Sequence, residues 1–180
     1  MRKTRLRQTL RHGAVLTALL LWPAAASADV ALGWYNLQWP TSMTVTAGTP
    51  TENVYGRVWA DGVTNQPGQA IGIMAQVGYG PQADLPTEAS WTWWNMTYNL
   101  DTGNDDEYMG TITPTQVGTF AYTTRFSGDG GLAWNYADLD GPVYDIGRGG
   151  VLTVTPEPAS LALAALATAA APLLPRRRQR

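Results

Sequence analysis

The chain has 180 residues, no cysteine, a single histidine and a formal net charge of −2 at pH 7, but its charge is unevenly distributed. Residues 29–156 contain three arginines against thirteen acidic residues, a net charge of −10, and no lysine, histidine or cysteine. The absence of histidine and cysteine excludes a Cys or His zinc site, Ser-His-Asp or Cys-His catalysis and a disulfide framework in this region. The negative charge argues against nucleic-acid binding, because phosphate recognition depends on Lys and Arg.

The first 28 residues have the pattern of a secretory signal peptide. Five basic residues precede an apolar stretch from Ala14 to Ala26, and Ala26-Ser27-Ala28 supplies the small residues that signal peptidase accepts. A permanent membrane anchor is the alternative, but Pro23 and the alanines leave only about ten strongly apolar residues, too few to span a bilayer. We therefore expect a signal helix, export through the secretion machinery and cleavage before Asp29.

Residues 29–155 are predicted to form one antiparallel β-sandwich, with a small barrel as the alternative. Seven Trp, eight Tyr and two Phe favour sheets over helices. In the run 71–77, the odd positions are expected to face the core. Turn signals separate the predicted strands, which are 32–39, 43–46, 53–60, 71–77, 91–98, 107–113, 118–127, 133–138 and 151–155.

Residues 117–126 resemble late strands of immunoglobulin-like and fibronectin-like domains. Phe120, Tyr122 and Phe126 fall on one strand face, and Gly118 with Tyr122 has the spacing of a tyrosine corner. The turn at 127–131 is expected to return the chain as a hairpin through residues 134–136. The resemblance implies an Ig-like or fibronectin-like fold and carries no function by itself.

The C-terminus combines three features, an uncharged span over residues 159–175 between Pro156-Glu157-Pro158 and a basic end, Arg176, Arg177, Arg178 and Arg180. As a helix the uncharged span would be about 25 Å long, close to the thickness of the bilayer core. The arginines would then stay on the cytoplasmic side. A permanent anchor and an Ala-rich amphipathic tail are the alternatives.

Residues 156–180 resemble the PEP-CTERM sorting signal of Gram-negative bacteria that make exopolysaccharide. The resemblance implies that an exosortase recognises Pro156, Glu157 and Pro158, with the terminal arginines as a cytoplasmic stop. It also implies a transient stage in the inner membrane, followed by release from, or attachment to, the cell surface.

The segment Trp91-Thr92-Trp93-Trp94 is the candidate glycan-binding feature. In a strand, Trp91 and Trp93 share one face and Trp94 the other, so at least one ring should approach the surface. An exposed ring beside acidic and amide groups can hold a sugar by stacking, which makes Trp93 and Trp94 candidate glycan-binding residues. The alternative is that Trp91 and Trp93 fill the core while Trp94 covers a sheet edge.

Parts of residues 93–141 are also loosely similar to β-domains of secreted bacterial proteins that accompany glycan-active enzymes. The same region contains an acidic loop whose carboxylates are the oxygen ligands that calcium prefers, Asp101, Asp105, Asp106 and Glu107. The order does not match a helix-loop-helix calcium loop, and a solvated turn is the alternative. No other cofactor is expected.

Asp138 and Asp140 form a second pair of carboxylates, about 7 Å apart at their Cα atoms if the segment is extended. They suggest a metal clamp or the acid and base of a glycosidase, although a strand ending in a turn explains them equally. The arginines Arg57 and Arg125 are expected to pair with carboxylates.

Together these features predict an exported cell-surface or extracellular-matrix protein with a non-catalytic β-sandwich that associates with exopolysaccharide. A carbohydrate-binding module with structural calcium is the first alternative. A small glycan-cleaving enzyme is the second.

Overall fold

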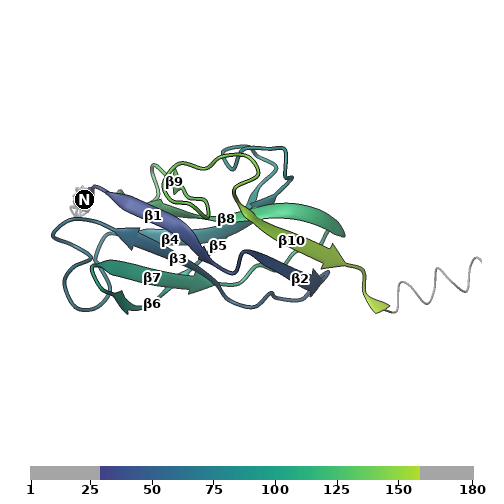
Figure 1. Ribbon diagram of the computed structural model, residues 1–180, viewed down its shortest axis with the longest axis horizontal. Coiled ribbons are helices and arrows are strands. Elements are labelled where there is room, and N and C mark those ends of the chain that lie inside the picture. The colour runs from purple at the N-terminus through teal and green to yellow at the C-terminus, as the bar shows by residue number, and fades with distance from the viewer. Residues whose placement is uncertain (1–28, 159–180) are drawn as a thin grey trace, which may run out of the picture.

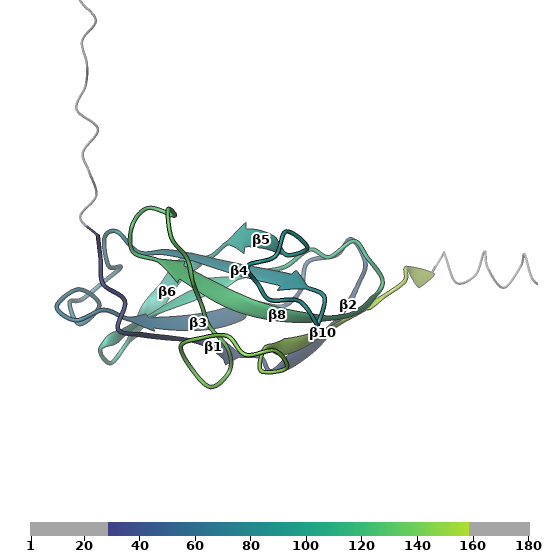
Figure 2. The same ribbon diagram turned by 90° about the horizontal axis from the view of Figure 1, so that it is seen from above.

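The computed structural model describes residues 29–158, which form ten β-strands in two facing sheets (Figure 1). The predicted signal peptide, the predicted membrane span at 159–175 and the terminal arginines lie outside the described residues. Within residues 29–158, no helix has the length and apolar character needed to cross a membrane. The two ends of the described chain lie at opposite ends of the long axis of the sandwich (Figure 1, Figure 2).

The ten strands form two hydrogen-bonded sheets, A and B. Sheet A consists, in spatial order, of β1 (Trp34–Trp39), β3 (Val54–Trp59), β7 (Asp105–Gly110) and β6 (Thr97–Thr102). Sheet B consists, in spatial order, of β2 (Ser42–Thr46), β10 (Gly150–Thr155), β8 (Gly118–Ser127), β4 (Met74–Gly80) and β5 (Thr92–Asn95), with β9 (Asn135–Tyr136) paired to β8.

The strand order corresponds to the A-B-E-D and C-F-G sheets of immunoglobulin sandwiches, with the first strand divided between β1 and β2. The predicted all-β sandwich is therefore present. One strand pair departs from the predicted antiparallel arrangement, because β2 and β10 pair in parallel, from Ser42 beside Val151 to Thr46 beside Thr155.

The core forms where alternate side chains of both sheets meet. Tyr35 of β1 and Tyr108 of β7 contact Phe126 of β8, with ring centroids 6.2 Å and 6.1 Å apart. Leu37 and Val58 are fully buried beside them. Burying large apolar side chains is the main driving force for folding, so this aromatic contact across the sandwich joins the two sheets.

Several predicted strand bounds differ from the observed ones, and the clearest differences concern the predicted strands 91–98 and 71–77. The predicted strand 91–98 is divided at the buried Met96, since β5 belongs to sheet B and β6 to sheet A. Ile71 is 90% exposed because β4 begins only at Met74, although Ile73 is buried as predicted. Alternation predicts the face of a residue only where the chain is already extended.

The predicted hairpin after β8 is present, and the predicted tyrosine corner is not. Phe126 pairs with Asn135 in the short ladder between β8 and β9. The Tyr122 hydroxyl, however, donates to the carbonyl oxygen of Pro40, 82 residues earlier, and not to backbone just upstream. This bond fastens β8 to the connection between β1 and β2, and burial raises the pKa of Tyr122.

Candidate functional site

Trp93 and Trp94, the candidate glycan-binding residues, lie on opposite faces of β5. Trp94 packs against the main core and stacks on Tyr79 with ring centroids 5.8 Å apart. Trp93 stacks with Trp91 at 5.7 Å in a separate aromatic cluster on the outer face of sheet B. The two rings therefore do not form one platform. Of the alternative reading, the burial of Trp91 is confirmed, with Trp93 packed against it in this second cluster, whereas Trp94 packs against the main core and does not cover a sheet edge.

Arg125 covers the exposed side of Trp93. Its guanidinium carbon lies 4.1 Å from the Trp93 ring centroid and 4.3 Å from that of Trp134. Its Nε and Nη2 donate to Oε1 of Gln76 at 2.8 Å and 2.5 Å. The expectation that Arg125 pairs with a carboxylate is wrong. A guanidinium stacked between two indoles leaves no room for a sugar on this face of Trp93.

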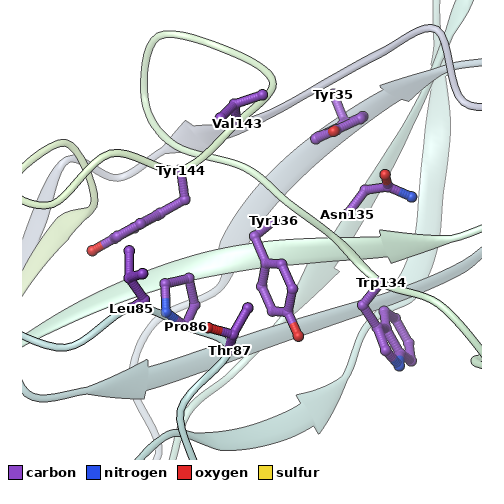
Figure 3. A pocket seen from close by; sticks show the side chains of 9 residues that line it. All are labelled: Tyr35, Leu85, Pro86, Thr87, Trp134, Asn135, Tyr136, Val143 and Tyr144. Atoms are coloured by element: carbon purple, nitrogen blue, oxygen red, sulfur yellow. The ribbon is translucent and has the colours of Figure 1, made fainter.

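A pocket of about 310 Å³ lies beside this cluster, between the 85–87 loop that follows β4 and the 134–144 segment that contains β9 (Figure 3). Its volume falls at the lower end of the range for small-molecule sites. The pocket has no charged lining residue, and its walls are formed by Tyr35, Leu85, Pro86, Thr87, Trp134, Asn135, Tyr136, Val143 and Tyr144. It is suited to an uncharged ligand that can stack on rings.

The aromatic walls of the pocket are held by a second layer of rings. Tyr136 packs on Trp93 at 5.7 Å and Tyr144 packs edge-on against Trp91 at 5.9 Å, measured between ring centroids. Tyr136 stands between Trp134 and the 85–87 loop (Figure 3). Because these rings are fixed before a ligand arrives, little conformational entropy is lost on binding.

Val143 at the pocket has a φ of 75°, the one non-glycine residue among the described residues with a positive φ. The left-handed region is unfavourable for a β-branched side chain, and such strain is characteristic of ligand sites. The Val143 side chain is 71% exposed, so it is held there without burial in the core. The strained backbone of Val143 is therefore part of the pocket wall.

The four predicted calcium ligands are not brought together. Asp101 accepts hydrogen bonds from the Tyr98 hydroxyl and from the amide of Gly68, at 2.9 Å. Asp106 is fully buried and accepts from the Ala70 amide at 2.8 Å. Asp105 and Glu107 lie on the other face of β7, and residues 29–158 contain no group of three His, Cys, Asp or Glu side chains placed to hold a metal.

The protonation equilibria of this loop follow from its hydrogen bonds. The Tyr98 hydroxyl and the Gly68 amide lower the pKa of Asp101, and the same hydrogen bond raises the pKa of Tyr98 to about 12. Burial raises the pKa of Asp106 and of Asp105, because desolvation disfavours the charged carboxylate. Asp101 and Asp106 thus fasten residues 68–70 to β6 and β7.

Asp138 and Asp140 form a turn and not an acid and base pair. Oδ1 of the buried Asp138 accepts from the amides of Asp140, at 2.8 Å, and Gly141, at 3.0 Å. Asp140 pairs with Arg148, which is the one ion pair between side chains of residues 29–158. The expected pairing of Arg57 with a carboxylate is therefore absent from this part of the chain at ion-pair distance.

The Pro-Glu-Pro segment follows β10 directly. β10 ends at Thr155, before the Pro156 nitrogen, which has no hydrogen to donate to a sheet. Glu157 and Pro158 are exposed. The segment is accessible in the described part of the chain, while the span that follows it lies outside that part.

Sequence reasoning did not identify the pocket. It placed residues 134–136 in a hairpin and in the loose similarity over residues 93–141, but named no ligand site there, and it assigned no role to the 85–87 loop or to Tyr144. The pairing of β4 with β8 brings those segments together, and no spacing in the sequence indicates that they meet. The positive φ of Val143 has no sequence signal either.

No family model matches the chain. Part of it is similar to amylopullulanases, with 34% identity over 122 residues for the protein from Thermoanaerobacter thermohydrosulfuricus and 37% over 100 residues for that from Thermoanaerobacterium thermosulfurigenes. These matches cover 58% and 47% of this chain but only 8% and 5% of the relatives. The chain therefore spans less than a tenth of the length of these two relatives.

Among solved structures, the chain is similar to the CARDB domain of a Pyrococcus furiosus protein, whose structure was determined in complex with di-metal ions. The identity is 12%, the TM-score is 0.32, and the match covers 70% of this chain and 96% of that domain.

Proposed function

We propose that the chain is an exported, non-catalytic β-sandwich that binds an uncharged sugar in the pocket between residues 85–87 and 134–144. The observation that carries the proposal is the wall of Tyr136, Tyr144 and Trp134, whose rings are fixed by Trp93, Trp91 and Arg125. A sugar ring presents apolar C–H faces to such rings and hydroxyls to the polar side chains of the lining, Asn135 and Thr87.

The similarity to part of the amylopullulanases supports a carbohydrate as the ligand. It extends over at most 10% of those proteins, as expected of a domain that accompanies an enzyme. Pullulan, the polysaccharide in the relatives' name, is accordingly the first glycan to test. Release of reducing sugar from pullulan by the purified chain would contradict the absence of catalysis.

The described side chains favour binding over catalysis. Glycosidases need two carboxyl groups across a cleft, one of them able to donate a proton. Asp138 is occupied by backbone amides, and Asp140 is paired with Arg148. Neither of them lines the pocket, and none of the pocket's lining residues is charged.

Filling the pocket tests the proposal without disturbing the core. Thr87 is exposed at the pocket, so Thr87→Trp should occlude it, whereas Gln82→Trp places the same ring at an exposed position outside the lining. We expect the full chain to bind maltotriose, Thr87→Trp to weaken binding at least tenfold, and Gln82→Trp to bind as the wild type does. Isothermal titration calorimetry measures all three, and equal affinity for the three chains would refute the site.

We further propose that the chain is delivered to the cell surface or the extracellular matrix by exosortase processing at Pro156, Glu157 and Pro158, and associates there with exopolysaccharide. The exposure of Glu157 and Pro158 beyond the last strand supports access by a processing enzyme. Replacing all three residues by Ala should leave the C-terminal segment attached in the native host. Immunoblotting of membrane and medium fractions detects this, and unchanged release of the variant would refute the sorting proposal.

A further inference from the structure

The outer face of sheet A carries polar and aromatic side chains in register. Alternation directs Trp34, Asn36 and Gln38 of β1 outward, while Tyr35 and Leu37 face the core. Asn36 lies beside Arg57 of β3, and Arg57 lies beside Glu107 of β7. Asn99 of β6 donates to Glu107 Oε1 at 2.6 Å, so one polar row crosses all four strands.

A second row of outward side chains lies beside the first on the same face of sheet A, and the residues at its β1 and β3 end are aromatic. Trp34 pairs with Trp59, and both line a shallow hollow of about 380 Å³ with Asn104 and Asp105. A Cβ on Gly33 would come within 2.3 Å of the Trp59 ring, so this indole rests directly on backbone. The two half-exposed rings are therefore held in place at the edge of the polar row.

Hydrogen-bonding capacity on this face is not satisfied within the protein. Eight buried side-chain nitrogen or oxygen atoms of residues 29–158 have no partner, and four of them belong to outward residues of sheet A: Asn36 Oδ1, Gln38 Oε1, Arg57 Nε and Thr102 Oγ1. Buried polar atoms are usually paired, because an unpaired one loses its hydration without compensation. Small rotations of these half-buried side chains would let a ligand rich in hydroxyls supply the missing partners.

The charge of the face favours a neutral ligand. Arg57 is the one cation among the outward residues, and Asp105 and Glu107 are two anions, in a domain that is itself strongly acidic. An anionic chain would be repelled, whereas neutral hydroxyls can donate to the half-buried Asp105 carboxylate and accept from the guanidinium, while Glu107 is itself buried and holds Asn99. The distance from β1 to β6 is about 14 Å, longer than a single sugar ring needs.

We propose that the outer face of sheet A is a second carbohydrate site, which binds a neutral polysaccharide chain across β1, β3, β7 and β6 with Trp34 and Trp59 as stacking rings. It shares its ligand class with the proposed function but uses a different surface and different residues. One domain then holds a short sugar in the pocket on the sheet B side and a polymer chain on the outer face of sheet A.

The test uses the unpaired amides. The double variant Asn36→Ala and Gln38→Ala removes two buried amide oxygens that have no hydrogen-bond partner in the protein, so the melting temperature should stay the same or rise. Affinity for pullulan should fall at least tenfold, because the polymer loses two hydrogen-bonding groups. The matched control removes the exposed loop amides Asn65 and Gln66, and should leave both quantities unchanged.

Three further measurements separate this site from the pocket and from self-association. Maltotriose affinity should be unaffected by the sheet A variant, and alginate, an anionic polysaccharide, should not bind. Pullulan affinity equal to that of the wild type in the folded double variant would overturn the sheet A site and leave the pocket standing. A change of oligomeric state in the variant, seen by light scattering, without loss of pullulan binding would show that the face contacts a second copy instead.

Discussion

The outer faces of the two sheets use the same residue types in opposite ways. On sheet B, Arg125 is enclosed between Trp93 and Trp134 and bonded to Gln76. On sheet A, Arg57 lies between Asn36 of β1 and Glu107 of β7, yet its Nε has no partner. The comparison teaches that an arginine on an outer sheet face can be fully engaged by neighbouring side chains, as Arg125 is, or keep an unpaired nitrogen, as Arg57 does, and the proposed sheet A site uses the second arrangement.

Removing Arg125 tests this contrast most strongly. Arg125→Ala deletes three cation–π contacts and two hydrogen bonds, and we expect a loss of about 2 to 4 kcal/mol of unfolding free energy. Urea denaturation followed by tryptophan fluorescence measures it. Arg148→Ala is the matched control, because its ion pair is exposed and should contribute about 0.5 kcal/mol or less. Equal effects of the two variants would contradict the structural role of the cluster.

The second prediction concerns the bond that fastens β8 to the β1–β2 connection. Tyr122→Phe removes the hydroxyl that donates to Pro40 and leaves a buried carbonyl oxygen without that donor, so stability should fall by about 1 to 2 kcal/mol. Thermal unfolding of the two chains side by side measures this. Tyr55→Phe, at a half-exposed ring on the outer face of sheet A, is the control and should have little effect.

The third prediction concerns the buried carboxyl group of Asp106 in β7 of sheet A. Burial raises the pKa of Asp106 in the folded state, so folding takes up protons and the contribution of Asp106 to stability falls as pH rises through its folded pKa. Asp106→Asn keeps an acceptor for the Ala70 amide without the charge. We expect a gain on the order of 1 kcal/mol at pH 7 and a smaller gain, or none, at pH 3.

Urea denaturation of both chains at the two pH values gives the comparison. Asp101 has a lowered pKa and acts with the opposite sign, which is why the difference between variant and wild type is measured instead of the wild type alone. A larger gain at pH 3 than at pH 7 would contradict the assignment.

The smallest expected effect is that of calcium. Asp101 and Asp106 are engaged with residues 68–70, and Asp105 and Glu107 point to the other face of β7. We therefore expect millimolar calcium or a chelator to move the melting temperature by less than about 1 °C. A calcium-dependent rise of several degrees would restore the sequence-based prediction.

Strand positions could be predicted from the sequence because they depend on local patterns. The alternation in Ile73, Ala75 and Val77 and the turn residues around β8 gave strands close to the observed ones. The division at Met96 could not be predicted, since each half of the run 91–98 has strand character and only tertiary pairing assigns it to a sheet.

The candidate sites were predicted less well for a related reason. The sequence identified Trp93 as an aromatic of interest, but its covering residue Arg125 is 32 positions away and its neighbour Trp134 is 41 positions away. The pairing of Trp34 with Trp59 depends on the register of β1 and β3, which no short motif encodes. Sites built by register or by loop convergence require the fold to be known first.

The position of β10 has a mechanical consequence. β10 lies between β2 and β8 and has five residue pairs with each of them, and the chain leaves the sandwich from its end at Thr155 (Figure 1). A pulling force applied at Pro156 acts along the strand axis, so it loads the hydrogen bonds on both sides together in shear and does not open them one after another. To extend a domain tethered through this end, the force would have to break both ladders at once, so the domain would resist extension.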